Sequence, residues 1–159
     1  MTISLIVGIE TETNYRFMPW TSLRYFGSML GFSKIGHNVI SSVVVMNPLI
    51  TIVTPVFNGV KYVAQCIHSV AAQVRPGIEH LIVDGGSSDG TVDILKRSAA
   101  QFSHLRWISE PDDGQSDAMN KGISLAQGRV LGFLNVDDFY EPGLLSRIHE
   151  LFSKQLKRE

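Results

Sequence analysis

The sequence has one cysteine, few prolines and no marked excess of charge of either sign, and each shortage excludes a class of protein. A single thiol, Cys66, cannot form an internal disulfide, and the five histidines stand singly, so neither a disulfide scaffold nor a zinc site is expected. Fourteen Lys+Arg against fifteen Asp+Glu give a net charge of -1, which argues against nucleic acid as a partner. Six prolines and 44% hydrophobic residues in 159 positions exclude a disordered chain and indicate one globular domain.

The N-terminal part also lacks a long uninterrupted hydrophobic run. Residues 26–46 are the only stretch of sufficient length for a membrane helix, but Lys34 and His37 interrupt it near its centre. No basic residue precedes the first short apolar run, so a signal peptide is not expected. We therefore expect residues 1–47 to form a peripheral or poorly ordered N-terminal extension of unclear structure and residues 48–159 to form the folded domain.

From residue 48 onward, short apolar runs alternate with segments of helical spacing. Runs of β-branched residues predict buried strands, and apolar residues three or four positions apart predict helices. The expected strands are 49–54, 80–84, 105–109 and 129–134, and the expected helices are 60–71, 91–100, 115–126 and a last one entered through Pro142. This alternation predicts an α/β fold, a mostly parallel sheet with helices on both faces. Gly128 is expected to cap the third helix at its C-terminus.

Polar residues follow each expected strand at the point where the strand ends. They occupy positions 54–58, 84–89, 110–117 and 137–138. In open parallel sheets, ligands bind outside the carboxyl ends of the strands. The sequence therefore predicts one site at that edge of the sheet.

The second of these clusters, 84–91, is rich in glycine and serine and leads into a helix. Its structural interpretation is a tight turn in which Ser88 or Asp89 caps the helix. Its functional interpretation adds Asp84, whose carboxylate can accept hydrogen bonds from a nucleobase N–H or a ribose hydroxyl while the glycines let a ligand approach. The glycine spacing excludes a dinucleotide fingerprint, a phosphate-binding P-loop and an EF-hand.

Asp137 and Asp138 form an adjacent carboxylate pair after the last strand. Two neighbouring carboxylates repel each other unless a cation or hydrogen bonds offset the repulsion, and carboxylate oxygens suit Mg²⁺ or Mn²⁺. The alternative is a solvated turn ahead of a helix. The pair is therefore a candidate metal site.

The helix expected at 115–126 carries a third polar group near its start. Asp117 and Lys121 are four positions apart, which predicts an exposed ion pair of a few tenths of a kcal/mol. The functional alternative is that Asp117, Asn120 and Lys121 face a sugar diphosphate at the edge of the sheet.

Taken together, these motifs resemble the family 2 glycosyltransferases, inverting enzymes of the Rossmann-like GT-A fold that bind nucleotide sugars. The matching strings are ITIVTPVFN at 50–58, IVDGGSSDGT at 82–91, SEPDDG with DAMNKG at 109–122, and NVDD at 135–138. Each string is short, but their order and spacing make the match specific. A signalling receiver fits less well, because receivers carry their acidic pair after the first strand, where this chain has Thr54 and Pro55.

The resemblance implies transfer of a sugar from a nucleotide-diphosphate donor, a UDP-sugar being favoured, to a hydroxyl of a glycan or lipid-linked acceptor. It implies inversion, a Mn²⁺ or Mg²⁺ cofactor, a role in polysaccharide or envelope-glycan synthesis, and a cytoplasmic location, with association with the inner face of a membrane left open. Asp84 would read the base, Asp137 would lie near the ribose, and Asp138 would hold the metal. The implied metal ligands are Asp137 and Asp138, and the implied nucleotide-sugar-binding residues are Thr54, Pro55, Val56, Asn58, Asp84, Gly85, Ser87, Asp117, Asn120, Lys121 and Asp137.

Two departures from the family pattern qualify this expectation. Many members carry a second aspartate where this chain has Gly85, so base reading is assigned to Asp84 alone. The family's general base lies well C-terminal to the metal aspartates, and this chain ends about twenty residues after Asp138. We therefore expect the donor-binding half of the fold, truncated at its C-terminus. The alternative is a nucleotide-sugar-binding module without catalytic activity.

Overall fold

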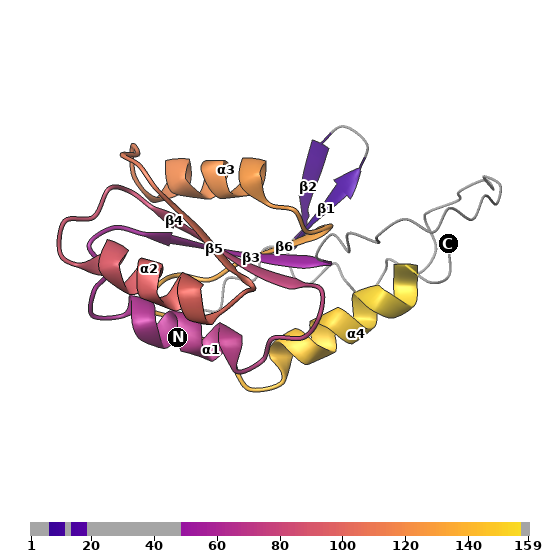
Figure 1. The fold of residues 1–159 in the computed structure, drawn as a ribbon. Helices are drawn as coiled ribbons and strands as arrows, with labels where there is room; N and C mark the ends of the chain where they lie inside the picture. Colours follow the sequence, from indigo (N-terminus) through magenta and orange to yellow (C-terminus); the bar gives the residue numbers. More distant parts are fainter. Residues whose placement is uncertain (1–6, 12–13, 19–48, 157–159) are drawn as a thin grey trace, which may run out of the picture.

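The computed structural model describes residues 7–11, 14–18 and 49–156, which form a six-stranded sheet with helices on both faces (Figure 1). The elements in chain order are β1 (Val7–Thr11), β2 (Asn14–Met18), β3 (Ile50–Val56), α1 (Val63–Ala71), β4 (Ile78–Asp84), α2 (Thr91–Gln101), β5 (Leu105–Ser109), α3 (Gln115–Leu125), β6 (Val130–Phe133) and α4 (Leu144–Leu156). The four strands and four helices expected from residue 48 onward are confirmed. Their bounds differ from the expected ones by a few residues.

The strand order is β2-β1-β6-β3-β4-β5, and β6, β3, β4 and β5 run parallel. The register aligns Val56 with Asp84 and Asp84 with Ser109, so β3, β4 and β5 end at the same edge of the sheet. This arrangement brings the polar clusters that follow the strands to one edge, as the sequence predicted.

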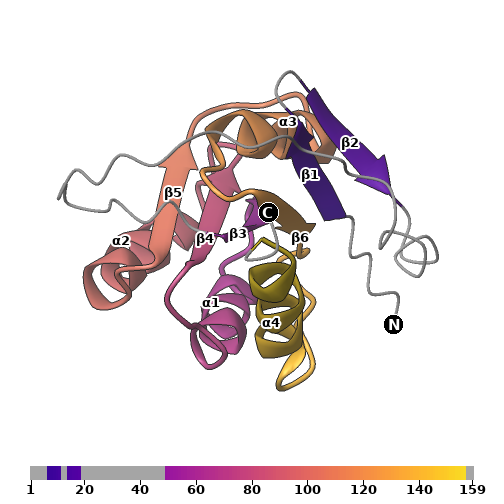
Figure 2. The same ribbon diagram turned by 90° about the vertical axis from the view of Figure 1, so that its right-hand side faces the viewer.

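Alternate residues along the buried strands face opposite layers of helices. Ile52 on β3 packs in a cluster with α1 and α4, whereas its neighbour Val53 packs in a cluster with α3. Figure 2 shows α3 alone on one face, with α1, α2 and α4 on the other. Helix α3 lies especially close to the sheet, since a Cβ on Gly122 would stand only 2.3 Å from Cγ1 of Val53.

The N-terminal hairpin is an addition that the sequence did not predict. Strands β1 and β2 pair antiparallel, and β1 pairs antiparallel with β6 through Gly8 and Ile9, which extends the parallel sheet at that edge. Residues 26–46, the stretch considered above for a membrane helix, lie outside the described residues. Within the described ranges, the helices are all too short or too polar to span a bilayer.

The expected role of Gly128 as a helix cap is wrong. Helix α3 ends at Leu125, and the next residue, Ala126, is extended. Gly128 instead lies against β3: its N–H donates to Oγ1 of Thr51 at 2.9 Å, and a Cβ at this position would stand 2.5 Å from the backbone nitrogen of Thr51. The close approach of two backbones therefore requires glycine here.

One buried histidine makes the stability of the fold depend on pH. His80 lies on β4 with no exposed surface, and its Nε2 is 3.0 Å from Oγ1 of Thr54. Burial, reinforced by His104, lowers the pKa of His80 to about 3. The unfolded state takes up a proton below about pH 6.5 while the folded state does not, so the free energy of unfolding falls as pH falls through that window.

We expect His80 to contribute a loss of about 2 kcal/mol in the free energy of unfolding between pH 7.5 and pH 5. Urea unfolding at the two pH values, for the wild type and for His80→Gln, measures this contribution. The variant keeps a polar side chain for Thr54 and removes the titration, so its stability should fall less than that of the wild type. Equal losses in the two proteins would contradict the assignment, whatever His104 contributes to both.

Candidate functional site

A pocket of about 720 Å³ opens at the carboxyl ends of the parallel strands. Its walls come from the end of β3 and the loop that follows it, from the start of the β4–α2 loop, from the segment that enters α3, and from the loop after β6. The lining residues are Pro55, Val56, Phe57, Asn58, Gly59, Tyr62, Gly85, Asp112, Gly114, Gln115, Ala118, Asn135, Val136 and Asp137. The predicted site residues Pro55, Val56, Asn58, Gly85 and Asp137 are therefore brought together.

Asp84 lies beneath this pocket and does not line it. Its side chain has no exposed surface, and its oxygens accept hydrogen bonds from the backbone N–H groups of Gly86 and Ser87 and from the hydroxyls of Ser87 and Ser109. Four donors match the acceptor capacity of a carboxylate. Asp84 thus fixes the conformation of the β4–α2 loop, and direct reading of a base by Asp84 stays a prediction that this geometry does not favour.

The loops after β3 and β4 hold each other in place. The N–H of Asn58 donates to Oγ of Ser87 at 2.7 Å, and the N–H of Ser88 donates to Oδ1 of Asn58 at 3.0 Å. Asn58 adopts a left-handed backbone conformation, with φ of 49°, which asparagine tolerates better than most residues. Ser87 therefore supports the pocket wall through Asn58 and does not line the pocket itself.

Asp89 fixes the other end of this loop. Its carboxylate accepts hydrogen bonds from the N–H and hydroxyl of Thr91 and from the N–H of Val60. The Thr91 hydroxyl contributes most to holding the pKa of Asp89 below its ordinary value. The N-cap position of α2 is Gly90, so Asp89 caps the helix from one residue further out than is usual.

Thr54 and Cys66 are buried and do not line the pocket. Oγ1 of Thr54 is 3.9 Å from Sγ of Cys66, and Sγ in turn lies 4.0 Å from the carbonyl oxygen of Asn135. Burial, reinforced by the carboxylates of Asp138 and Asp137, raises the pKa of the Cys66 thiol to about 12. The thiol is therefore protonated and unsuited to nucleophilic chemistry, and the buried Thr54 directly precedes the lining residue Pro55.

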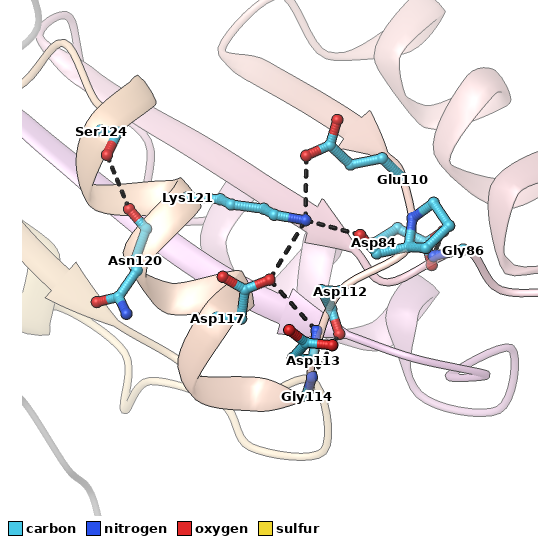
Figure 3. Close-up of polar contacts among 11 residues, drawn as sticks. Asp84, Gly86, Glu110, Asp112, Asp113, Gly114, Asp117, Asn120, Lys121 and Ser124 are labelled. Atoms are coloured by element: carbon cyan, nitrogen blue, oxygen red, sulfur yellow. Dashed lines mark hydrogen bonds and ion pairs between the residues drawn. The ribbon is translucent and has the colours of Figure 1, made fainter.

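Asp117, Asn120 and Lys121 do not line the pocket. Nζ of Lys121 lies 3.4 Å from the Asp117 carboxylate and 3.1 Å from that of Glu110, and it donates to the carbonyl of Pro111 at 2.8 Å (Figure 3). The expected Asp117–Lys121 ion pair is confirmed. Lys121 belongs to α3 and contacts both Glu110 and Pro111, so it also ties the segment between β5 and α3 to the helix.

The carboxylate pair Asp137–Asp138 follows β6, two strands away from β4 and Gly85. Asp137 is exposed and lines the pocket, whereas Asp138 is half-buried and accepts a hydrogen bond from Nδ2 of Asn135 at 3.3 Å. Oδ1 of Asn135 accepts from Nε2 of Gln115 at 2.8 Å. This chain of amides links Asp138 to the first residue of α3, so the position of the carboxylate is coupled to the pocket wall.

The residues present suit a divalent cation that arrives together with an anionic ligand. Within residues 49–154, no group of three or more His, Cys, Asp or Glu side chains could enclose a metal ion. Asp137 and Asp138 supply carboxylate oxygens only. Mg²⁺ is typically bound by one or two carboxylates together with phosphate oxygens and water, and the pair fits that mode. The fit favours a metal held jointly by the chain and a phosphate ligand.

Sequence reasoning missed several residues of the pocket wall. Asp112 and Gly114 belong to the SEPDDG string, and Gln115 lies between that string and DAMNKG, but the sequence predicts no role for any of the three. A usable signal was the Asp-x-Gly spacing: Oδ1 of Asp112 accepts the N–H of Gly114 at 2.9 Å, and Gly114 has φ of 102° immediately before α3.

Comparison with known proteins adds an independent result. Residues 51–157 match the family model described as Glycosyl transferase family 2. The chain is 35% identical over 109 residues to chondroitin synthase from Escherichia coli, which covers 69% of this chain and 16% of that protein. It is 36% identical over 102 residues to the putative teichuronic acid biosynthesis glycosyltransferase TuaG of Bacillus subtilis, covering 63% of this chain and 40% of that protein.

Solved structures share the fold. The mannosyltransferase PcManGT from Pyrobaculum calidifontis, in complex with GDP-Man and Mn²⁺, superimposes with a TM-score of 0.58 at 23% identity, over 63% of this chain and 31% of that one. TarS from S. aureus, in complex with UDP-GlcNAc, gives a TM-score of 0.59 at 21% identity, over 66% of this chain and 31% of that one. The chain thus spans less than half the length of each of these relatives.

Proposed function

The chain belongs to glycosyl transferase family 2, and from that premise we propose that its pocket binds the nucleotide-diphosphate part of a sugar donor. The reaction we propose is transfer of the sugar to an acceptor hydroxyl with inversion at the anomeric carbon. A UDP-sugar is the favoured donor, and a glycan or lipid-linked molecule is the favoured acceptor. Because nucleotide sugars are cytoplasmic metabolites, we propose a cytoplasmic site of action.

The observation that carries the proposal is the composition of the pocket wall. One end carries Asp137 beside Asp138, the middle is formed by Pro55 and Val56, and the far end holds Gly85 beneath an acidic loop. A nucleotide sugar has a flat aromatic base at one end, the transferred sugar at the other, and a cation-binding diphosphate between them. The wall offers apolar contacts for the base and carboxylates for a metal–diphosphate complex.

Asp137 and Asp138 are the residues that would hold Mn²⁺ or Mg²⁺. When bound, the metal would supply Lewis acidity that offsets the negative charge developing on the leaving diphosphate. The chain's own part is to keep the Asp138 carboxylate in place, through the hydrogen bond from Asn135 to Asp138 and that from Gln115 to Asn135. The deprotonation of the acceptor hydroxyl needs a general base in addition, and the residues described above serve the donor.

The relatives suggest a biological context. They include chondroitin synthase, hyaluronan synthase and a teichuronic acid glycosyltransferase. Chondroitin, hyaluronan and teichuronic acid are all polysaccharides. We accordingly propose a role in polysaccharide or envelope-glycan synthesis.

Thermal melting with UDP, GDP and TDP, each with and without Mn²⁺, tests the donor site. Saturation at about a hundred times the dissociation constant adds ~2.7 kcal/mol to the stability of the folded state, which raises the melting temperature by several degrees. We expect one nucleotide to give this shift, and only in the presence of Mn²⁺; Mn²⁺ alone is the control. A folded protein whose melting temperature no nucleotide changes would contradict the proposal. If one nucleotide binds, the matching nucleotide sugar distinguishes an enzyme from a binding module: an enzyme releases the sugar or transfers it, and a binding module does neither.

A further inference from the structure

The carboxylate of Asp112 occupies the space above Gly85 at the edge of the pocket. An ideal Cβ on Gly85 would lie 2.7 Å from Oδ2 of Asp112 and 3.0 Å from its Oδ1. Gly85 follows β4, whereas Asp112 belongs to the segment between β5 and α3, and both line the pocket. The missing side chain at position 85 therefore makes room for a carboxylate that is delivered from another loop.

Asp112 is held in this place by its own loop. Its Oδ1 accepts the N–H of Gly114, and Lys121 ties the neighbouring Pro111 carbonyl to α3 (Figure 3). Among the described residues, no donor is bonded to Oδ2, which is the oxygen nearer to the Gly85 position. The half-buried carboxylate thus presents one free acceptor at the pocket edge.

The charges of the pocket decide which part of a ligand can face this acceptor. Among the described residues, the pocket is lined by two acidic side chains, Asp112 and Asp137, and by no basic one. A diphosphate facing Asp112 would be repelled, whereas a hydrogen-bond donor would be attracted. Gly85 follows β4 and Asp137 follows β6, with β3 between them. Two strand spacings of ~4.8 Å therefore separate the two ends of the site by roughly 10 Å.

We propose that Oδ2 of Asp112 accepts a hydrogen bond from the ring N–H of the donor's base, and that this contact selects a base that carries such an N–H. Uracil, thymine and guanine share this chemistry; cytosine and adenine lack the ring N–H. Gly85 is needed because any side chain there would displace the carboxylate. The inference rests on the nucleotide-binding function proposed above, and it gives the base contact to Asp112 in place of the buried Asp84.

The first test replaces Asp112 by asparagine and measures nucleotide affinity by titration calorimetry with Mn²⁺ present. Asp112→Asn keeps the oxygen that accepts the Gly114 N–H but offers the base an NH₂ donor where Oδ2 was. We expect the dissociation constant for the preferred nucleotide to rise at least tenfold while the melting temperature of the free protein stays within about two degrees. Asp113→Asn is the matched control, since Asp113 is the exposed neighbour, carries the same charge and does not line the pocket.

Methylated nucleotides distinguish a base contact from a general effect on the loop. The probes are UDP and TDP against their N3-methyl forms, and GDP against its N1-methyl form. The wild type should bind the preferred nucleotide at least tenfold more tightly than its methylated form, and Asp112→Ala should bind the two more nearly alike. Equal discrimination in wild type and Asp112→Ala would overturn the assignment of the base contact to Asp112.

A double-mutant cycle tests the relation between Gly85 and Asp112. Gly85→Ala alone should weaken binding as much as Asp112→Ala, because it displaces the carboxylate, but it should cost little further when Asp112 is already alanine. Additive losses would overturn the proposed relation. Failure of the wild type to bind any of the three nucleotides with Mn²⁺ would overturn the proposed function itself, and the inference with it. Binding by the wild type that Asp112→Asn leaves unchanged would overturn the inference alone.

Discussion

Gly128→Ala is expected to lower the free energy of unfolding by about 3 to 5 kcal/mol, a large part of the 5–15 kcal/mol typical of a folded domain. The added methyl group would lie 2.5 Å from the backbone nitrogen of Thr51 and 2.7 Å from the carbonyl carbon of Ile50. Strand β3 pairs with β4 on one side and β6 on the other, so it cannot shift to make room. The segment before β6 must therefore move away from β3.

That movement would also break hydrogen bonds of the buried Glu79. Gln127 donates its N–H to Oε2 of Glu79 at 3.2 Å, and the same carboxylate accepts from Thr51 and pairs with Arg106. Glu79 is only 5% exposed, and losing one of the hydrogen bonds to such a charged group costs about 1.5–3 kcal/mol. Overpacking adds a further cost of about 1–3 kcal/mol. The sum gives the expected loss.

Urea unfolding followed by circular dichroism measures this loss against Gly143→Ala. Gly143 is the matched control because a Cβ there would meet no atom within 4 Å. Its φ of 83° makes alanine strained by about 1–2 kcal/mol, so this variant measures the backbone cost without the steric contact. A loss for Gly128→Ala no larger than that for Gly143→Ala would show that steric contact with β3 is not what requires the glycine.

Asp138→Asn is expected to abolish the Mn²⁺-dependent part of nucleotide binding, raising the dissociation constant at least tenfold, or about 1.4 kcal/mol. The substitution keeps the shape of the side chain and removes one negative charge from the adjacent pair. Because Asp137 and Asp138 repel each other without a cation, the free protein should be as stable as the wild type or slightly more stable. Binding and stability would thus change in opposite directions.

Calorimetric titration of the nucleotide in the presence and absence of Mn²⁺, with thermal melting of the free protein, measures both effects. Asp93→Asn is the control: it makes the same change of charge on α2, where Asp93 forms only an exposed ion pair with Lys96 at 3.9 Å. Unchanged Mn²⁺-dependent binding in Asp138→Asn would exclude this carboxylate as a metal ligand. A large loss of stability in the free protein would indicate a structural role instead.

The strands and helices from residue 49 onward were predictable because their signals are local. A run such as Ile50–Thr54 is apolar and β-branched over a length that fits a buried strand, and it lies inside β3 as observed. The position of the site was predictable for the same reason, since each polar cluster directly follows a strand. The pairing of β1 with β6 was not predictable, because the N-terminal segment shows no comparable pattern.

Individual roles in the site depended on contacts between distant positions. Asp84 ends a strand and is polar, which is typical of a ligand-binding residue. Its oxygens nevertheless accept hydrogen bonds from Ser109 on β5 and from Gly86 and Ser87 in the loop after β4. Lys121 lies one helical turn from Asp117, so local spacing predicted their ion pair. Its hydrogen bond to the carbonyl of Pro111, which joins α3 to the segment after β5, was not predictable in this way.

The sequence by itself determined the family, the α/β fold and the edge of the sheet at which the polar residues gather, because order, spacing and hydrophobic periodicity are properties of neighbouring residues. Only the tertiary structure decided which of those residues reach the pocket. The contact of Gly128 with Thr51 spans 77 positions, and the carboxylate of Asp112 lies over Gly85 from a different loop. Such proximities arise from the packing of strands and loops against one another, and no local pattern of residues encodes them.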